Sequence, residues 1–176
     1  MSDDSRVLQQ LKKISLLDGL PSDAISSLAA RVTLHQVRRR RVIFLPGDPG
    51  VSVYLLMSGR VKISRVTRDG KELTLCYLDQ GELFGELCLV DGGPREDMAE
   101  TMENVLVSEI PREAFLELLE SSPAVGARMT MLRCQRRREL ERKVEDLVFK
   151  DVSAKLAELL LDLGRQHGVD HSGGVL

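Results

Sequence analysis

Short apolar runs separated by glycine turns fill the middle of this 176-residue chain, and they limit its possible folds more than any other feature. Between about Leu34 and Ile110 the runs are RVIFL, VYLLM, RVKISRV, ELTLCYL, ELFGELCLV and NVLVSEI, with PGDPG, SG, RDG, DQG and DGG between them. The RDGK segment predicts a hairpin, because Asp-Gly accommodates the positive φ angles of a tight turn. Many short strands at this spacing indicate a sandwich or barrel rather than βαβ units. We therefore predict an antiparallel β roll, of the jelly-roll type.

Helical periodicity flanks this region on both sides, so the predicted fold class is α+β. Residues 1–32 indicate short helices, the second of which Ser22 can cap. After the β region, Pro111 opens a further short helix, and a long helix without interior proline runs from about 124 to 149. Another helix starts at Asp151.

The long helix is much longer than a small roll needs for cover. Its Leu140, Val144 and Leu147 have a four-then-three spacing that suits a seam between two helices. We predict a parallel homodimer through residues 124–149. The alternative is a helix that packs only on its own β domain.

Composition excludes several classes of function. No stretch approaches 18 uncharged apolar residues, and the N-terminus MSDDSRVLQQ has no signal-peptide core, so we expect a cytoplasmic protein without a membrane partner. No nucleophile–base–orienter set is visible, so we predict that the chain is not an enzyme and has no catalytic residues. The cysteines and histidines lack metal-ligand spacing, so we predict no metal site: Cys76, Cys88, Cys134, His35, His167 and His171.

Four stretches, in this order, resemble the catabolite activator protein/FNR family of bacterial transcription regulators. VIFLPGDPGVSVYLLMSGRVKI resembles the first strands of the family's roll, and GELFGELCLVDGGPR its phosphate-binding cassette. IPREAFLELLESSP resembles the exit helix, and LVFKDVSAKLAELLLDL the hinge and first helix of the DNA-binding domain. The resemblance covers essentially the whole chain. It implies three parts: a cyclic-nucleotide-binding-like sensor over 1–122, a dimerisation helix over 123–150, and a hinge with the first DNA-binding helix over 151–176.

In that family a winged helix-turn-helix follows, and its second helix enters the major groove. The sequence ends at Leu176, where this element would begin. We therefore expect a truncated sensor and dimerisation fragment, with a natural regulator lacking a DNA reader as the alternative. DNA would be bound only through the missing domain.

The cassette residues have the chemistry that a phosphate requires. A glycine-bearing turn leaves backbone N–H groups free for an anion, and an arginine matches two phosphate oxygens in a fork. The resemblance implies backbone contacts from Gly85 and Leu87, a ribose hydroxyl bound by Glu86, and a phosphate paired with Arg95. The alternative is a tight turn whose Glu86 pairs with a neighbouring arginine.

Two acids after the arginine depart from the family's pattern of Ser or Thr followed by Ala. Glu96 and Asp97 stand there, and an ionised carboxylate cannot donate a hydrogen bond. At about 4 Å from a phosphate, like charges repel by roughly 1 kcal/mol in water and by about 4 at an effective dielectric of 20. Alternatively, one of these acids neutralises Arg95. Either way, we predict that cyclic AMP binding is weak or absent.

The long helix departs from the family pattern as well. The positions that resemble the family's adenine-contacting Thr-Ser pair are Leu140 and Glu141, and neither has a hydroxyl. Arg136 matches a family arginine that approaches Glu86 and the phosphate. The alternative reading of Arg136 is one of several solvated arginines in QRRRELER.

The effector class therefore stays open among cyclic AMP, cyclic GMP and cyclic di-GMP, with none certain. The acid after Arg95 resembles the Clp-type subfamily, which is associated with cyclic di-GMP. The rival interpretation is a roll that binds no ligand and acts by protein contacts or constitutive dimerisation.

Overall fold

The computed structural model describes residues 3–12, 14–67, 69–89 and 92–149, together with isolated positions from 153 onward. The chain divides into two compact units, Met1–Thr130 and Met131–Leu176, and each is described by itself. Most of the predicted hinge and helix from Asp151 onward lies outside the described residues.

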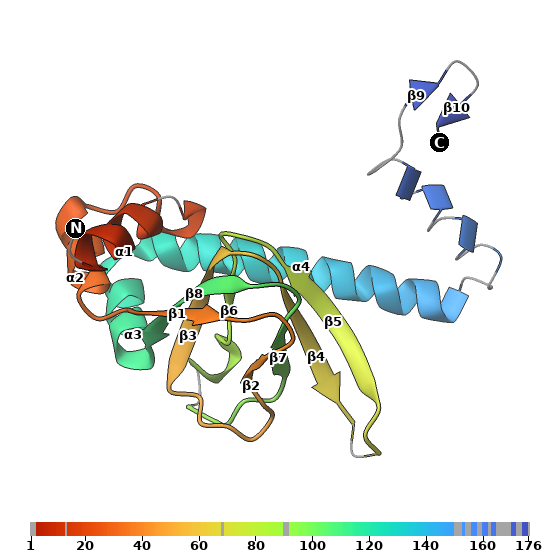
Figure 1. Ribbon diagram of the computed structural model, residues 1–176, viewed down its shortest axis with the longest axis horizontal. Coiled ribbons are helices and arrows are strands. Elements are labelled where there is room, and N and C mark those ends of the chain that lie inside the picture. The colour runs from red at the N-terminus through yellow and green to blue at the C-terminus, as the bar shows by residue number, and fades with distance from the viewer. Residues whose placement is uncertain are drawn as a thin grey trace. The chain divides into compact units, whose positions relative to one another are not determined.

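The first unit contains two four-stranded antiparallel sheets that form a β roll (Figure 1). The strand order is β1-β8-β3-β6 in one sheet and β2-β7-β4-β5 in the other. The bounds are β1 Thr33–Val37, β2 Val42–Phe44, β3 Ser52–Ser58, β4 Val61–Val66, β5 Glu72–Leu78, β6 Leu83–Phe84, β7 Met98–Thr101 and β8 Val105–Pro111. This architecture confirms the predicted antiparallel roll and the α+β class.

The helices are α1 Asp3–Leu11, α2 Ser22–Ala29, α3 Arg112–Ser121 and α4 Pro123–Phe149, with 3-10 turns η1 Ser15–Leu17 and η2 Leu87–Leu89. Figure 1 shows α1, α2 and α3 gathered at one end of the roll. The start of α4 belongs to the first unit, where Val125 is fully buried and Arg128 Nη1 donates to the carbonyl of Leu16 at 3.3 Å. The second unit contains the rest of α4 and the paired strands β9 Asp170–His171 and β10 Gly174–Val175.

The core of the roll lies between the two sheets. It is built from apolar side chains that alternate with outward-facing residues along each strand. The largest fully or almost fully buried members include Leu56, Val61, Leu78, Phe84 and Val107.

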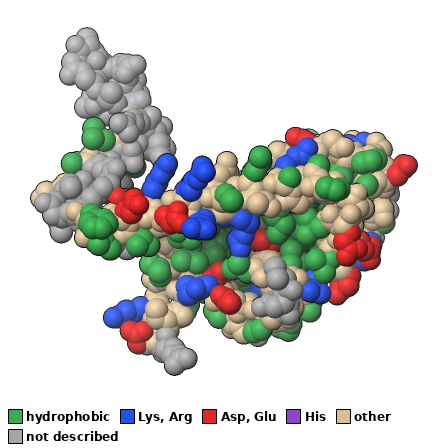
Figure 2. Space-filling model, turned by 180° about the vertical axis from the view of Figure 1, so that it is seen from behind, with side chains coloured by type: hydrophobic (Ala, Val, Ile, Leu, Met, Phe, Trp, Pro, Cys, Tyr) green, Lys and Arg blue, Asp and Glu red, His purple; other side chains and the backbone are tan. Residues whose placement is uncertain are grey.

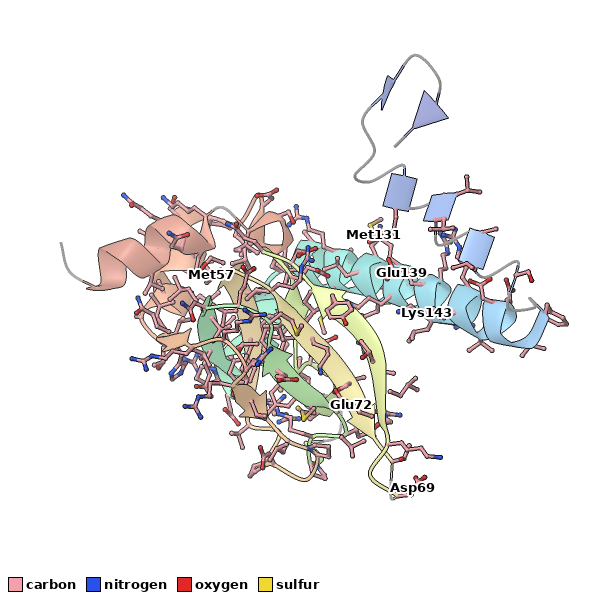
Figure 3. All side chains as sticks on the ribbon, turned by 45° about the vertical axis from the view of Figure 1, so that its right-hand side comes forward. Met57, Asp69, Glu72, Met131, Glu139 and Lys143 are labelled. Carbon is pink, nitrogen blue, oxygen red and sulfur yellow. The ribbon has the colours of Figure 1, made fainter. Side chains whose placement is uncertain are left out.

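The β4–β5 hairpin has the turn that the sequence predicts, with Gly70 at φ +79°. Figure 3 labels Asp69 at the hairpin tip and Glu72 on β5. On β4, Lys62 pairs with Glu72 and with Glu100, each at 2.8 Å. These two carboxylates raise the pKa of Lys62 to about 12.

Charge is unevenly spread over the surface. Figure 2 shows acidic side chains gathered at the helical end of the first unit, on the right of that view. Helix α3, which lies at that end of the roll, contains three glutamates: Glu113, Glu117 and Glu120. Among the described residues, no helix combines the length and the apolar character needed to cross a bilayer.

Candidate anion-binding site

The candidate cassette begins where β6 ends. Gly85 adopts φ +76°, a conformation that only glycine reaches without strain, and η2 follows directly. A Cβ at Gly85 would lie 2.6 Å from Nη1 of Arg95 and 3.3 Å from Cδ2 of Tyr54. The glycine is therefore needed both for the turn and for the close approach of the arginine.

Arg95 lies inside the roll with a relative exposure of 5%. Its Nη1 donates to the carbonyl of Gly85 and contacts Cys88 Sγ at 3.1 Å, while Nη2 donates to the carbonyl of Ser52. Among the described residues, its Nε has no hydrogen-bond partner and no carboxylate forms an ion pair with this guanidinium. A buried charge without a counter-ion is costly, so this group suits a bound anion.

Aromatic rings form the apolar wall beside this guanidinium. Phe44, Tyr54 and Phe84 stack on one another with centroid separations of 5.3 to 6.1 Å. The Arg95 guanidinium carbon lies 4.5 Å from the Phe44 ring centre and 5.5 Å from that of Tyr54. Burial raises the pKa of Tyr54. The rings supply cation–π attraction and exclude water from the charge.

A polar chain connects Arg95 to the outer strand β1. Arg95 Nη2 also reaches Ser52 Oγ at 3.4 Å, and Ser52 Oγ donates to the Tyr54 hydroxyl at 3.3 Å. Tyr54 in turn donates to Glu109 at 3.4 Å, and Glu109 pairs with His35 at 2.7 Å. The arginine is thus positioned by β3 and β8 as well as by the cassette turn.

The two acids after Arg95 point to a different arginine. Arg65 on β4 binds Asp97 at 2.8 Å and Glu96 at 3.0 Å. The Asp97 side chain is largely buried, whereas that of Glu96 is 68% exposed. The expectation that one of these acids neutralises Arg95 is therefore wrong, because Arg65 takes both of them.

The remaining predicted residues are placed as follows. Glu86 is buried beside Gly85, and Leu87 is half exposed on η2. Arg136, Leu140 and Glu141 lie on α4 in the second unit, where Glu141 accepts a hydrogen bond from Arg137 Nε at 2.7 Å. The cassette turn and Arg95 are brought together as expected, whereas the α4 residues belong to the separately described unit.

Several residues of this site escaped the sequence analysis. Phe44, Tyr54 and Ser52 looked like ordinary strand residues, because apolar alternation does not say which ring lies against a charge. Arg65 stands in the run RVKISRV, where the residue pattern gives no sign of its two carboxylate partners. Within the described part of the chain, no three His, Cys, Asp or Glu side chains cluster as metal ligands.

Comparison with known proteins gives a consistent result. A family model described as "Cyclic nucleotide-binding domain" matches residues 34–122. The "CRP-like cAMP-activated global transcriptional regulator" of Mycobacterium tuberculosis is 29% identical over 165 residues, covering 94% of this chain and 74% of that protein. The "Cyclic AMP receptor protein" of Thermus thermophilus is 32% identical, covering 89% of this chain and 72% of that protein.

Solved structures agree with this assignment. The c-di-GMP responsive global regulator CLP of Xanthomonas campestris superposes with a TM-score of 0.70 at 27% identity, covering 88% of this chain and 78% of that one. The Thermus thermophilus catabolite activator protein gives 0.64 at 32% identity, covering 86% and 71%. The curated relatives are named as regulators and receptors rather than enzymes, in agreement with the sequence-based prediction. The chain therefore belongs to the CRP/FNR family and contains its cyclic nucleotide-binding domain.

Proposed function

We propose that this chain is the effector-sensing and dimerisation region of a cytoplasmic bacterial transcription regulator. The observation that carries the proposal is Arg95, a buried guanidinium with an unpartnered Nε and no carboxylate ion pair among the described residues. A phosphate group supplies the missing negative charge in the fork geometry that arginine favours. Gly85, Glu86 and Leu87 would complete the cassette around it.

The ligand class that fits is a cyclic nucleotide, with cyclic AMP bound weakly or not at all. Glu96 directly follows Arg95 in the sequence, at the position of the hydroxyl that would donate to the phosphate, and an ionised carboxylate cannot donate that hydrogen bond. Leu140 and Glu141 on α4 offer no hydroxyl to an adenine base. Arg136 is a further candidate for the phosphate side.

Cyclic di-GMP is the second candidate effector. The likeness to CLP, which is described as responsive to c-di-GMP, favours it. The rival function is a roll without a ligand that acts by protein contact or constitutive dimerisation. It is favoured by the Arg95 donors that already bind the carbonyls of Gly85 and Ser52.

Dimerisation would run through α4. Its apolar residues Leu140, Val144 and Val148 recur every four residues and are all exposed. Residues 1–122 then form the sensor, 123–150 the dimerisation helix, and 151–176 the hinge and start of a DNA-binding domain. A ligand that binds one arrangement of the paired helices better shifts the population toward it, and the hinge at 149–151 transmits the change.

Isothermal titration calorimetry with cyclic AMP, cyclic GMP and cyclic di-GMP tests the effector site. We expect binding of at least one of them, and a loss of roughly 100-fold in affinity or more in Arg95→Met, since a charge-assisted fork contributes on the order of 3 kcal/mol. Arg95→Lys is the matched control, because lysine keeps the positive charge but lacks the forked guanidinium. Its affinity should lie between that of the unaltered chain and that of Arg95→Met. If none of the three nucleotides gives a heat of binding, the result would favour the roll that binds no ligand.

A further inference from the structure

Arg65 and Asp97 form a fixed donor and acceptor pair close to Arg95. Arg65 lies on β4, and Asp97 directly precedes β7, the strand that pairs with β4 (Figure 1). The register places Ser64 opposite Met98, so Arg65 and Asp97 come next at the same end of the two strands. Nε and Nη2 of Arg65 both bind one oxygen of Asp97, Oδ1, at 2.9 and 2.8 Å. Strand pairing and two hydrogen bonds therefore hold these side chains as a unit.

Asp97 shares the burial of the proposed phosphate anchor. Arg95 and Asp97 have relative exposures of 5% and 7%, whereas the side chain of Glu96 between them is exposed. Two residues of chain span at most about 7 Å between their Cα atoms. A ligand whose phosphate binds Arg95 can therefore reach Asp97 with another part of the same molecule.

Both members of the pair keep unused hydrogen-bonding capacity. Among the described residues, no donor binds Oδ2 of Asp97, and no acceptor binds Nη1 of Arg65. The Arg65 side chain is about half exposed, so a ligand can approach it from solvent. A carboxylate oxygen accepts up to two hydrogen bonds, and each guanidinium Nη has two hydrogens to donate. The pair thus offers an open acceptor beside an open donor.

We propose that Asp97 and Arg65 contact the base of the effector and select guanine over adenine. The inference rests on the proposed effector site and specifies the base of its ligand. One edge of guanine carries the acceptor O6 beside two donors, N1–H and N2–H₂, so O6 accepts from Arg65 while the two donors bind Asp97. Adenine has one donor, N6–H₂, beside one acceptor on the same edge, and it therefore makes fewer contacts with this pair.

Isothermal titration calorimetry tests the base preference by comparing cyclic GMP with cyclic AMP, and cyclic di-GMP with cyclic di-AMP. In at least one of these comparisons, the guanine nucleotide should bind roughly tenfold more tightly or better, because it makes an additional hydrogen bond to a charged group. Equal affinities for guanine and adenine would overturn this inference and leave the proposed effector site intact. A chain that binds none of the four nucleotides would refute both.

Asp97→Asn separates contact with the base from a purely structural role of the pair. An asparagine amide suits adenine rather than guanine, so the affinity for the guanine nucleotide should fall roughly tenfold while that for the adenine nucleotide stays constant or rises. Equal losses for both bases would overturn the inference, because the pair would then only support the cassette. Asp79→Asn is the matched control, since it alters the exposed Arg60–Asp79 pair, at 2.7 Å, and should leave the base preference unchanged.

Arg65→Met/Asp97→Leu keeps the test decisive if Asp97→Asn does not fold. Replacing both partners by apolar side chains leaves no unpaired charge at position 97, so the midpoint of thermal unfolding should change little. Guanine and adenine nucleotides should then bind this variant equally. A guanine preference that persists in the folded double variant would contradict the role of the pair.

Discussion

Arg95 places a full positive charge against aromatic rings rather than against a carboxylate. The Phe44 face, 4.5 Å away, and the carbonyls of Gly85 and Ser52 offset part of the desolvation cost. The partnerless Nε shows that this compensation is incomplete. Replacing the arginine by methionine should therefore leave the free energy of unfolding unchanged or increase it, although it removes the proposed phosphate anchor. An unfolding free energy that does not fall in Arg95→Met would support a functional rather than a structural role for the arginine.

Glu96 offers a test of the electrostatics next to that anchor. Because its carboxylate is exposed and paired with Arg65, the aqueous estimate of repulsion applies, about 1 kcal/mol, and Glu96→Ser should raise the affinity for a cyclic mononucleotide roughly fivefold. Calorimetry measures this change. Glu103→Ser removes an exposed acid from another loop and should leave the affinity constant. Unchanged or weaker binding in Glu96→Ser would show that Glu96 does not act on the phosphate.

The sequence pointed to some residues of the candidate site and missed others for a physical reason. The resemblance to the family's cassette implied roles for Gly85 and Arg95, and the structure places these two residues in contact, while their role in binding stays a prediction. The pairing of Glu96 and Asp97 with Arg65 was not predictable, because it joins residues about thirty positions apart across two strands. Side-chain partners of this kind depend on strand register, which the hydrophobic pattern alone does not define.

At the scale of elements, alanine substitutions at two glycines test how the turn between β6 and η2 is built. Gly81 and Gly85 both have positive φ, at +93° and +76°, but a Cβ at Gly81 meets no atom within 4 Å. Gly81→Ala should therefore cost only the backbone strain, about 1 to 2 kcal/mol. Gly85→Ala should cost more and also displace Arg95, which would abolish binding of the effector. Urea denaturation compares the two variants, and equal costs would show that the arginine moves aside freely.

The sheet β2-β7-β4-β5 carries a pH-sensitive ion cluster around Lys62. Its carboxylate partners raise the pKa of Lys62 from 10.5 to about 12, so the stabilisation is complete below pH 10.5 and disappears as the pH rises to about 12. The pKa shift alone would correspond to a loss on the order of 2 kcal/mol, and solvent screening of the partly exposed Glu72 and Glu100 lowers the expected loss to roughly 1 kcal/mol. Lys62→Met should show a smaller decrease in unfolding free energy over this range. Tyr54 titrates in the unaltered chain and in Lys62→Met alike, so the difference between their unfolding free energies reports Lys62. Identical dependence of the unfolding free energy on pH in the two proteins would contradict the stabilising role of Lys62.

Elements were more predictable than their pairing. Five of the six glycine-separated apolar runs overlap β2, β3, β4, β5 and β8, but ELFGELCLV forms only the two-residue strand β6 before the η2 turn, and β1 and β7 lie outside the predicted runs. The absence of interior proline predicted α4. The order β1-β8-β3-β6 joins strands that are distant in sequence, and no local signal encodes that order. Thr101, whose hydroxyl donates to the Arg38 carbonyl in the β1–β2 connection, is an example of a residue whose role appears only after such long-range pairing.

At the scale of the whole molecule, the proposed dimer rests on the exposed apolar positions of α4. Val144→Glu puts a charge at the centre of the row formed by Leu140, Val144 and Val148, and we expect it to convert a dimer into a monomer. Arg142→Glu introduces the same residue two positions away, off this face of the helix, and should leave the assembly intact. Sedimentation velocity distinguishes the two forms. A wild-type chain that stays monomeric at every accessible concentration would contradict the proposal.

The carbonyls of Gly85 and Ser52 that accept hydrogen bonds from Arg95 affect which anions could bind beside this arginine. A free inorganic phosphate ion would compete with both carbonyls for the guanidinium and would have only its own oxygens to offer in return. A nucleotide brings sugar and base contacts in addition to its phosphate. If Arg95 anchors the proposed effector, the two backbone carbonyls would compete with a simple anion, and a nucleotide would have the advantage because of its additional contacts.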